Sequence, residues 1–406
     1  MTPKSGRKRP GRRVLIIVEN LPVPFDRRVW QEANALRDAG YRVSIICPTG
    51  KGHDTRHETI DDISIYRHPL PPEGNGPKGY LREYAAALWW QFYLSLRIFK
   101  ENGFDAIHAC NPPDNIFLIA LFYKVVFGTR FIFDHHDINP ELYLAKFGRK
   151  DVFYRIMLLW ERLTFMTADH SIATNESYKA IAMRRGRMAP HEVTVVRSGP
   201  SLERMRPVPP NPVWKKGREF LIGYLGVMGP QDGIDHLLEV ARILVHEKDR
   251  RDVQFVLVGG GSELDPMRAL ARQMGLAEFV TFTGRIPDEP MVEILCTADI
   301  CVNPDVANEM NDKSTMNKIM EYMALGKPIV QYDLTEGRYS AQEASLYARP
   351  NDRRDFAGRI LELLDDPGRR KSMGEFGRRR VRDELQWEHE KPKLLQAYEI
   401  LFAHSG

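Results

Sequence analysis

Cysteine is scarce in this chain of 406 residues, which contains four cysteines and no CxxC or Cys/His spacing. All four stand in apolar, strand-like surroundings, a setting typical of small buried hydrophobic side chains. The sequence therefore predicts neither disulfide bonds nor a structural metal site. The four residues are Cys47, Cys110, Cys296 and Cys301.

Long hydrophobic runs are also missing. The apolar run at 14–18 is broken by Glu19, which makes it too short for the core of a signal peptide. The longest central run, 116–123, ends at Lys124 and falls well short of the about 20 residues that a spanning helix needs. We expect a cytoplasmic protein without a membrane-spanning segment.

Acidic residues are absent from the first 13 positions, which hold six lysines and arginines; without those six charges the formal net charge of +4 becomes −2. We expect residues 1–12 to form a disordered basic tail, either simply solvated or attracted to anionic lipid head groups. No pattern of basic and aromatic residues recurs in the rest of the chain, so nucleic acid is not an expected partner.

A chain of this length exceeds one hydrophobic core and favours two domains. In both halves, continuous Val/Ile runs alternate with segments of helical periodicity, the pattern of parallel strands buried on both faces. We therefore predict an α/β protein with two Rossmann-like, doubly wound parallel-sheet domains facing across a cleft. The expected strands are 14–20, 41–47, 105–110, 130–136, 170–174 and 193–199 in the first half, and 220–226, 253–261, 280–286, 298–304 and 328–333 in the second.

Prolines mark the expected boundary between the domains. Five of them stand between positions 200 and 216, where they exclude a regular helix or strand. We place the N-terminal domain at 13–205, the C-terminal domain at 206–380, and helices that can cross back to the first domain at 381–406. The stretch 80–100 predicts a helix, which either faces the core or lies on a membrane surface.

The segment 311–330 carries the strongest chemical signal. Ser314 and Thr315 predict the cap of a helix whose free N–H groups and dipole form an anion site suited to a diphosphate. One turn into that helix, Lys318 can add a point charge. Glu321 can accept hydrogen bonds from two hydroxyls of a sugar or ribose. The alternative is an ordinary capped helix with a solvated lysine and glutamate.

The same segment resembles the donor site of the retaining glycosyltransferases of family four. Lys313 stands where the family usually has its first acid, as in a subgroup whose loop reads like Ser-x-x-Asn-Lys and whose members resemble transferases of exopolysaccharides and cell-surface glycans. The residues that match the family's second acid and its Ala-x-Gly-x-Pro turn are Glu321, Ala324, Gly326 and Pro328.

The resemblance implies the GT-B architecture and the transfer of a hexose, with retention of configuration, from a nucleotide-diphosphate sugar. It implies a uridine or guanosine diphosphate sugar as donor and neither a metal nor a separate cofactor. The absence of an Asp-x-Asp turn at a strand end agrees with the lack of a metal requirement. It gives catalytic roles to Lys318 and Glu321 and donor-binding roles to Lys313, Ser314, Thr315, Met316 and Asn317.

A second match covers 222–238, a strand followed by a glycine-rich turn and a helix. Gly226 and Gly229 would let the backbone approach the leaving phosphates. Many relatives offer an arginine and a lysine in this turn, where this chain has Val227 and Asp232. The phosphate charge is then left to the helix dipole and to Lys318, Lys313 and Arg285.

Gly284 and Arg285 follow another expected strand, in a segment that resembles the base-binding turn of the family. We assign both to donor binding. A plain surface arginine is the alternative for Arg285.

The first half carries the acceptor-side resemblance. Asp26, Arg27 and Arg28 stand at a strand-to-helix junction and can orient an acceptor hydroxyl or phosphate; the alternative is a capped helix with a structural ion pair. Family members place a histidine, often followed by an acid, close to the donor sugar, and His136 and Asp137 take that place here. A metal site on His135 and His136 is not expected, because adjacent side chains on a strand point to opposite faces.

Three other functions are alternatives to the transferase; the first is disfavoured and the other two remain open. A dinucleotide-dependent oxidoreductase is disfavoured because 258–264 lacks the third glycine of the fingerprint and the first strand is followed by none. A sugar-nucleotide 2-epimerase would share the donor site, and a non-catalytic sugar-nucleotide-binding protein would explain the missing first acid. For the transferase, the family's habits suggest a glycan or polyprenyl-linked acceptor, approached as a peripheral protein at the inner face of an anionic cell membrane.

Overall fold

The computed structural model describes residues 11–70 and 76–403 and divides into two compact units. The first unit combines residues 1–197 with 390–406, and the second is Ser198–His389. The chain therefore leaves the first unit after residue 197, ahead of the expected boundary at 205, and re-enters it at residue 390 instead of 381. Residues 1–10 of the predicted basic tail lie outside the described residues.

An eight-stranded sheet forms the centre of the first unit, in the order β3-β4-β2-β1-β5-β6-β7-β8. The described pairings are parallel except for that of β3 with β4. All five residues of β5 are buried, as expected for a parallel strand covered on both faces. The strands are β1 (Arg13–Val18), β2 (Arg42–Pro48), β3 (His57–Ile60), β4 (Ile63–His68), β5 (Ala106–Cys110), β6 (Arg130–His135), β7 (His170–Ala173) and β8 (Val193–Val195).

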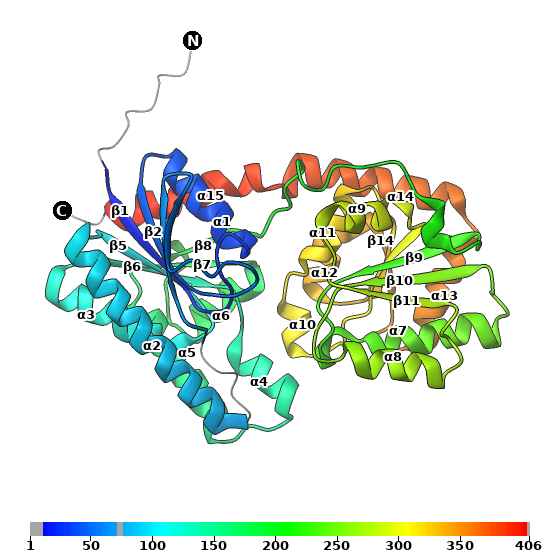
Figure 1. Cartoon of the computed structure of the whole chain (residues 1–406), viewed down its shortest axis with the longest axis horizontal. Coiled ribbons are helices and arrows are strands. Elements are labelled where there is room, and N and C mark those ends of the chain that lie inside the picture. The colour runs from blue at the N-terminus through cyan, green and yellow to red at the C-terminus, as the bar shows by residue number, and fades with distance from the viewer. Residues whose placement is uncertain (1–10, 71–75, 404–406) are drawn as a thin grey trace, which may run out of the picture. The chain divides into compact units, whose positions relative to one another are not determined.

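Helices cover both faces of this sheet, with α1 and α15 on one face and α2, α3 and α5 on the other (Figure 1). The Asp26 carboxylate caps α1 by accepting a hydrogen bond from the backbone N–H of Val29. The helices are α1 (Arg27–Asp38), α2 (Gly76–Glu101), α3 (Phe117–Phe127), α4 (Asn139–Phe147), α5 (Val152–Thr167), α6 (Glu176–Arg184) and α15 (Trp387–Ala403).

The second unit is built on a six-stranded parallel sheet in the order β11-β10-β9-β12-β13-β14. The strands are β9 (Phe220–Leu225), β10 (Val253–Val258), β11 (Val280–Gly284), β12 (Ile300–Asn303), β13 (Ile329–Tyr332) and β14 (Ser345–Ala348). The helices are α7 (Ile234–Arg242), α8 (Leu264–Gln273), α9 (Asp288–Thr297), α10 (Glu309–Lys313), α11 (Asn317–Ala324), α12 (Thr335–Ala341), α13 (Arg353–Leu364) and α14 (Pro367–Arg380).

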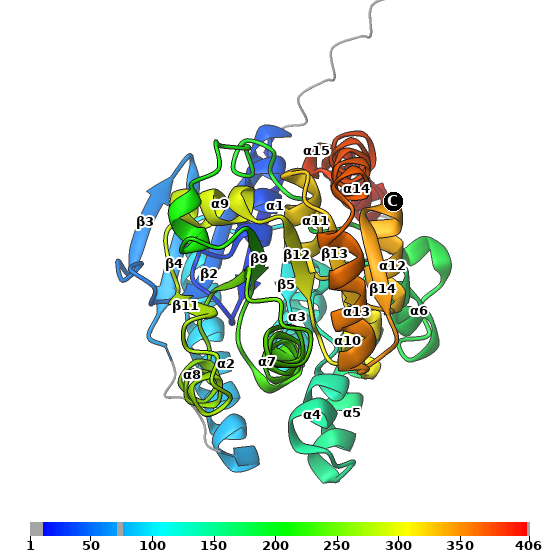
Figure 2. The ribbon, with the colours of Figure 1, turned by 90° about the vertical axis from the view of Figure 1, so that its right-hand side faces the viewer.

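Two apolar clusters hold the helices of the second unit against the sheet. One packs α7, α8 and α13 on one face, and the other packs α9 and α11 on the opposite face (Figures 1 and 2). The burial of these side chains is the main stabilising term, since removing apolar surface from water drives folding. The α11 helix is fixed to β9 by the Tyr322 hydroxyl, which accepts a hydrogen bond of 2.7 Å from the Leu225 N–H.

The strand order places a switch point in each sheet. In the first unit β1 lies between β2 and β5, and in the second β9 lies between β10 and β12. The loops that leave the carboxyl ends of strands at such a point diverge and leave room for a ligand. The doubly wound parallel sheets predicted for both halves are thus confirmed, although β3, β4 and β14 were not predicted. No helix in the described part of the chain is long and apolar enough to cross a membrane.

Candidate functional site

The switch point of the second unit brings one cation and two carboxylates together. Lys318, in the first turn of α11, places its Nζ 2.8 Å from Asp305 Oδ1 and 4.0 Å from Asp232 Oδ1. Asp305 follows β12, and Asp232 lies in the turn that follows β9. The ring of Tyr224 lies beneath the ammonium, with its centroid 4.9 Å from Nζ. The predicted lysine is therefore present at the carboxyl edge of the sheet, but it already has anionic partners.

Burial and ion pairing have opposite effects on the pKa of Lys318 and on that of Asp232. Burial alone would lower the pKa of Lys318, but the Asp305 and Asp232 carboxylates outweigh it and raise that pKa above its usual value. Burial raises the pKa of Asp232 to about 6, although Lys318 opposes the shift. Asp305 is 1% exposed, and its Oδ2 has no hydrogen-bond partner among the described residues. Lys318 therefore stays charged at neutral pH.

The glycine turn after β9 allows a close approach of backbone segments. Gly259 adopts φ +136°, and a Cβ there would lie 1.7 Å from the carbonyl oxygen of Gly226. A Cβ on Gly226 would in turn lie 2.6 Å from the Tyr224 hydroxyl. The predicted phosphate-binding N–H of Gly229 is already used, because it donates to Asp232 Oδ2 at 2.9 Å. A diphosphate would have to displace that contact to bind Gly229.

The cap predicted at the start of α11 is wrong in its detail. The Ser314 hydroxyl donates to the Met310 carbonyl at 2.7 Å and so closes the end of α10. The helix begins at Asn317, and Met316 at its N-cap position supplies no side-chain hydrogen bond. Thr315 and Met316 are half-buried and Asn317 is exposed. The start of α11 thus lacks a cap from Met316, which suits an external anion.

Two more predicted donor residues, Lys313 and Arg285, come from other elements than Lys318. Lys313 forms an ion pair of 2.5 Å with Glu309 on α10. Arg285 is exposed just after β11, which β10 separates from β9. Gly284 has φ +69°, and its carbonyl accepts a hydrogen bond of 3.0 Å from the Gly259 N–H. The structure therefore joins Gly284 to Gly259, the residue that follows β10, while the donor roles of Arg285 and Lys313 stay predictions.

Arg204 is a site residue that the sequence analysis missed. Its Nη1 donates to Glu321 Oε1 at 2.6 Å, and its Nε donates to Asp288 Oδ2 at 2.7 Å. Arg204 comes from the proline-rich segment that was expected to mark the domain boundary, far from Glu321 in sequence. No local pattern could have paired the two residues. The predicted hydroxyl-binding carboxylate of Glu321 is thus held by a guanidinium, with its side chain 14% exposed.

In the first unit, Arg28 is the centre of a buried charged cluster. Its Nη2 lies 3.0 Å from Asp134 Oδ1 and 3.0 Å from Glu32 Oε1, and its Nη1 donates to the Val196 carbonyl at 2.9 Å. His136 Nε2 lies 2.5 Å from Asp134 Oδ2 and 2.9 Å from Arg28 Nε. With 9% exposure, Arg28 has little surface to offer an acceptor. Its contacts support the structural ion pair that was the alternative interpretation.

The two buried carboxyl groups of this cluster differ in their protonation. Burial raises the pKa of Glu32 well above its usual value. Burial would do the same for Asp134, but Arg28 and His136 outweigh it and hold the pKa of Asp134 well below its usual value. The cluster thus pairs Arg28 with one carboxylate and favours a protonated Glu32. His108 bridges Asp134, 3.3 Å away, to the Tyr398 hydroxyl of α15, 2.8 Å away.

Four residues of this region, Glu32, His108, Cys110 and Asp134, place possible metal-ligand atoms within 4.8 Å of one another. The guanidinium of Arg28 already neutralises the Asp134 carboxylate, Glu32 is protonated, and burial raises the pKa of the Cys110 thiol well above its usual value. This set therefore does not suit a cation.

The predicted histidines at the end of β6 point to opposite faces of the sheet. His135 faces Glu161, with its Nε2 3.6 Å from Oε1, whereas His136 faces Asp134. The opposite orientation predicted for the two histidines is confirmed. Burial raises the pKa of Asp137. Of the predicted acceptor-side residues, Asp26 caps α1 and Arg28 belongs to the buried cluster, so both have a structural role. Arg27 is exposed.

Comparison with known proteins identifies the family. The family model described as "Glycosyl transferase 4-like domain" matches residues 26–199, and that described as "Glycosyl transferases group 1" matches residues 219–366. A 2-deoxystreptamine glucosyltransferase of Streptomyces kanamyceticus is 26% identical over 184 residues, which are 44% of this chain and 45% of the relative. A GDP-mannose-dependent phosphatidylinositol monomannoside mannosyltransferase of Corynebacterium glutamicum is 28% identical over 162 residues, covering 39% of this chain and 42% of that protein.

The fold has a solved counterpart. The sucrose-phosphate synthase of Thermosynechococcus elongatus superimposes with a TM-score of 0.81 at 20% identity, over 97% of this chain and 99% of the other. The chain spans less than half of the length of the first curated relatives that it matches. The two family models fall on the two α/β units, and together they show that the chain belongs to the group 1, or family four, glycosyltransferases of the GT-B fold.

Proposed function

We propose that the protein transfers a hexose from a nucleotide-diphosphate sugar to a hydroxyl of a glycan or lipid-linked acceptor, with retention of configuration and without a metal. The observation that carries the proposal is the position of Lys318. Its ammonium reaches to within 4.0 Å of Asp232, the residue that stands in the turn where relatives offer a lysine. The helix α11 thus supplies at the switch point the cation that the turn after β9 lacks.

Lys318 would stabilise the leaving group. As the bond between the anomeric carbon and the diphosphate oxygen breaks, negative charge grows on the diphosphate, and a preformed cation in a dry site stabilises that charge. Asp305 holds the ammonium in place and keeps it ionised. The acceptor oxygen forms the new bond to the anomeric carbon, and its proton passes to the departing diphosphate.

Glu321 would bind two hydroxyls of the donor. A carboxylate accepts hydrogen bonds from adjacent hydroxyls, and the Arg204 guanidinium orients the Glu321 carboxylate. Arg204 is therefore a positioning residue in this proposal. In the first unit, His136 would contact the reacting sugar, with Asp134 fixing its ring through the bond to Nε2.

The donor and the acceptor follow the family's chemistry. The name of one relative specifies GDP-mannose, so a guanosine diphosphate sugar joins a uridine diphosphate sugar as the first donors to test. A growing cell-surface polysaccharide or a polyprenyl-linked glycan is the proposed acceptor. A lipid-linked acceptor would be met through peripheral contact with the inner face of an anionic cell membrane, in the cytoplasm.

Calorimetric titration with uridine, guanosine and thymidine diphosphate sugars tests the donor site. We expect one donor to bind to the wild type, and K318M and E321Q to weaken that binding by roughly tenfold or more. K371M removes an exposed lysine of the same unit and serves as the matched control. Equal affinity in K318M, E321Q and the wild type would contradict the site.

Turnover tests the activity. With donor and acceptor together, we expect release of nucleoside diphosphate and a product whose anomeric proton coupling matches that of the donor. Conversion of the donor sugar without an acceptor would indicate an epimerase. Donor binding with no product across the acceptor panel would indicate a non-catalytic binding protein.

A further inference from the structure

An apolar face that no described residue covers lies on the first unit, along α2 and α3. Six of the eleven residues of α3 are large apolar side chains that are exposed, and α2 adds an exposed stripe at helical spacing. We call these residues the α2–α3 face. Its most exposed members are Trp89, Tyr93 and Leu96 on α2 and Val125, Val126 and Phe127 on α3.

The two helices form one continuous surface. The rings of Phe92 and Phe122 lie with centroids 5.3 Å apart, and those of Phe99 and Phe127 lie 4.4 Å apart. A hollow of about 340 Å³ between the helices is lined by apolar side chains that include Trp89, Phe92 and Leu118. Soluble monomers rarely leave so large an apolar patch open, which marks this face as an interaction surface.

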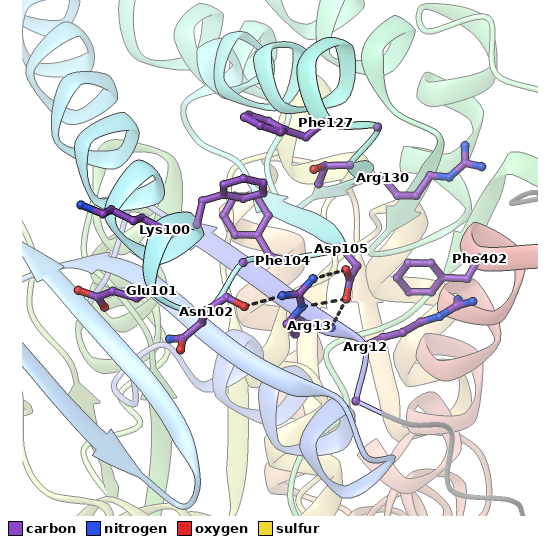
Figure 3. Close-up of a pocket in the computed structure, with 15 residues that line it drawn as sticks. Arg12, Arg13, Lys100, Glu101, Asn102, Phe104, Asp105, Phe127, Arg130 and Phe402 are labelled. Atoms are coloured by element: carbon purple, nitrogen blue, oxygen red, sulfur yellow. Dashed lines mark hydrogen bonds and ion pairs between the residues drawn. The ribbon is translucent and has the colours of Figure 1, made fainter.

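A basic pocket adjoins the α2–α3 face at the amino ends of β1, β5 and β6 (Figure 3). The pocket has a volume of about 1050 Å³ and is lined by Arg12, Arg13, Lys100 and Arg130, against two acids, Glu101 and Asp105. Phe127 belongs to both the pocket and the face. Because His136 lies at the opposite, carboxyl edge of the sheet, the pocket is separate from the proposed catalytic residues.

Two of these cations form no ion pair with a residue that the structure describes. Arg13 is bound to Asp105 at 2.7 Å, and Arg130 lies 3.4 Å from Asp169. Arg12 is half-buried and lies over the ring of Phe402, and its Nη1 is shielded from solvent without a hydrogen-bond partner among the described residues. Lys100 is exposed and forms no ion pair with any residue that the structure describes. The pocket thus has unneutralised positive charge next to an apolar surface.

We infer that the α2–α3 face and the basic pocket dock the protein on the surface of an anionic lipid bilayer. The exposed apolar side chains would enter the boundary of head groups and acyl chains, where Trp89 and Tyr93 suit both environments. Arg12 and Lys100 would meet lipid phosphates. The eleven-residue α3 is too short to span a bilayer and the 26-residue α2 is not apolar enough, so both helices would lie on the surface. The inference rests on the proposed function in one respect: it assigns the peripheral membrane contact proposed there to a defined surface.

Sedimentation of the full-length protein with vesicles tests the inference. We expect binding to vesicles of phosphatidylcholine with phosphatidylglycerol and much weaker binding to phosphatidylcholine alone. V125Q/V126Q removes two side chains that are 75% and 55% exposed and should lower partitioning by roughly fivefold or more. R12Q/K100Q should lower it by roughly tenfold at low ionic strength, with a smaller effect in added salt.

Matched controls come from the second unit. V208Q/V213Q replaces two valines that are 40% and 72% exposed, and R251Q/K371Q removes the same charge from exposed positions, so both should bind as the wild type does. Thermal unfolding checks that each variant is folded. No donor or acceptor is present, so failure of the transferase proposal leaves this result unaffected.

Three outcomes would overturn the inference. In the first, the wild type fails to sediment with anionic vesicles. In the second, V125Q/V126Q and R12Q/K100Q both bind as well as the wild type, which assigns the binding to another part of the chain. In the third, V125Q/V126Q converts a dimer into a monomer by analytical ultracentrifugation, which makes a second copy of the chain the occupant of the face.

Discussion

Lys318 Nζ lies 2.8 Å from Asp305 Oδ1, with both side chains withdrawn from water. An ion pair in this setting fixes the ammonium for a diphosphate, and it also makes each partner depend on the other. Removing one partner from a buried pair leaves an uncompensated charge, whereas replacing both can be close to neutral. The pair therefore links the proposed catalytic role of Lys318 to the stability of the second unit.

The variant K318M should lose both stability and activity. We expect its free energy of unfolding to fall by about 3 kcal/mol, because Asp305 is left buried without a cation. Turnover should fall by roughly a hundredfold or more through loss of the charge that meets the diphosphate. The double variant K318M/D305N should regain most of the stability, measured by urea unfolding, and none of the turnover. A double variant with near-wild-type turnover would remove Lys318 from the mechanism.

Asp232 should weaken nucleotide binding in a pH-dependent way. Its pKa is raised by burial to about 6, so it is ionised at about pH 7.5 and mostly protonated at about pH 5.5. The ionised carboxylate competes with a diphosphate for Lys318 and repels it. D232N should therefore bind nucleoside diphosphate roughly tenfold more tightly than the wild type at about pH 7.5, and about equally at about pH 5.5.

Calorimetry with uridine and guanosine diphosphate measures this difference. The nucleotide takes up a proton over the same pH range, but this cancels in the ratio of the two dissociation constants. A ratio that does not change with pH would show that Asp232 does not face the diphosphate.

The alternation of strands with helices along the chain made the fold predictable. The site was harder to predict because its contacts join residues that are distant in sequence. The buried Val/Ile runs located β1 and β9, whereas β3 alternates between exposed and half-buried residues and gave no such signal. Lys318 and Glu321 could be found from a local motif. Their partners could not, because Asp305 and Arg204 reach them through tertiary packing. The cap at Ser314 was misassigned since the loop extends to Met316 before α11 begins.

Glu161 should make the first unit less stable as the pH rises. Burial raises the pKa of this carboxyl from 4.5 to about 7, although Arg185 opposes the shift. The folded state then holds a proton that the unfolded state releases, so stability is full below pH 4.5 and falls through about pH 7. Asp114, whose pKa burial raises to about 6, acts in the same direction. His135 stays neutral in this window, since burial lowers its pKa to about 4.

We expect the free energy of unfolding to fall by about 2 kcal/mol or more between about pH 5 and pH 8, and E161Q to make that fall clearly smaller. Arg185 keeps Glu141 as a partner at 3.0 Å in this variant. Hydrogen exchange of the β6 and β7 amides at the two pH values reports on this unit alone. An exposed carboxyl change, E176Q, should leave the slope unchanged, and a slope in E161Q as steep as that of the wild type would assign it to other groups.

Substitution of Arg28 distinguishes a structural role of this residue from a role in acceptor binding. Its guanidinium contacts Asp134, Glu32 and the Val196 carbonyl at the same time, a geometry that the single ammonium of lysine cannot reproduce. R28K should therefore lower the free energy of unfolding by about 2 kcal/mol or more, while the folded fraction keeps its KM for the acceptor. The exposed neighbour provides the control, because R27K should leave stability unchanged. An acceptor-binding Arg28 would give the opposite result: R28K would raise KM and leave the unfolding transition in place, since the cost would then fall on the bound acceptor and not on the buried carboxylate of Asp134.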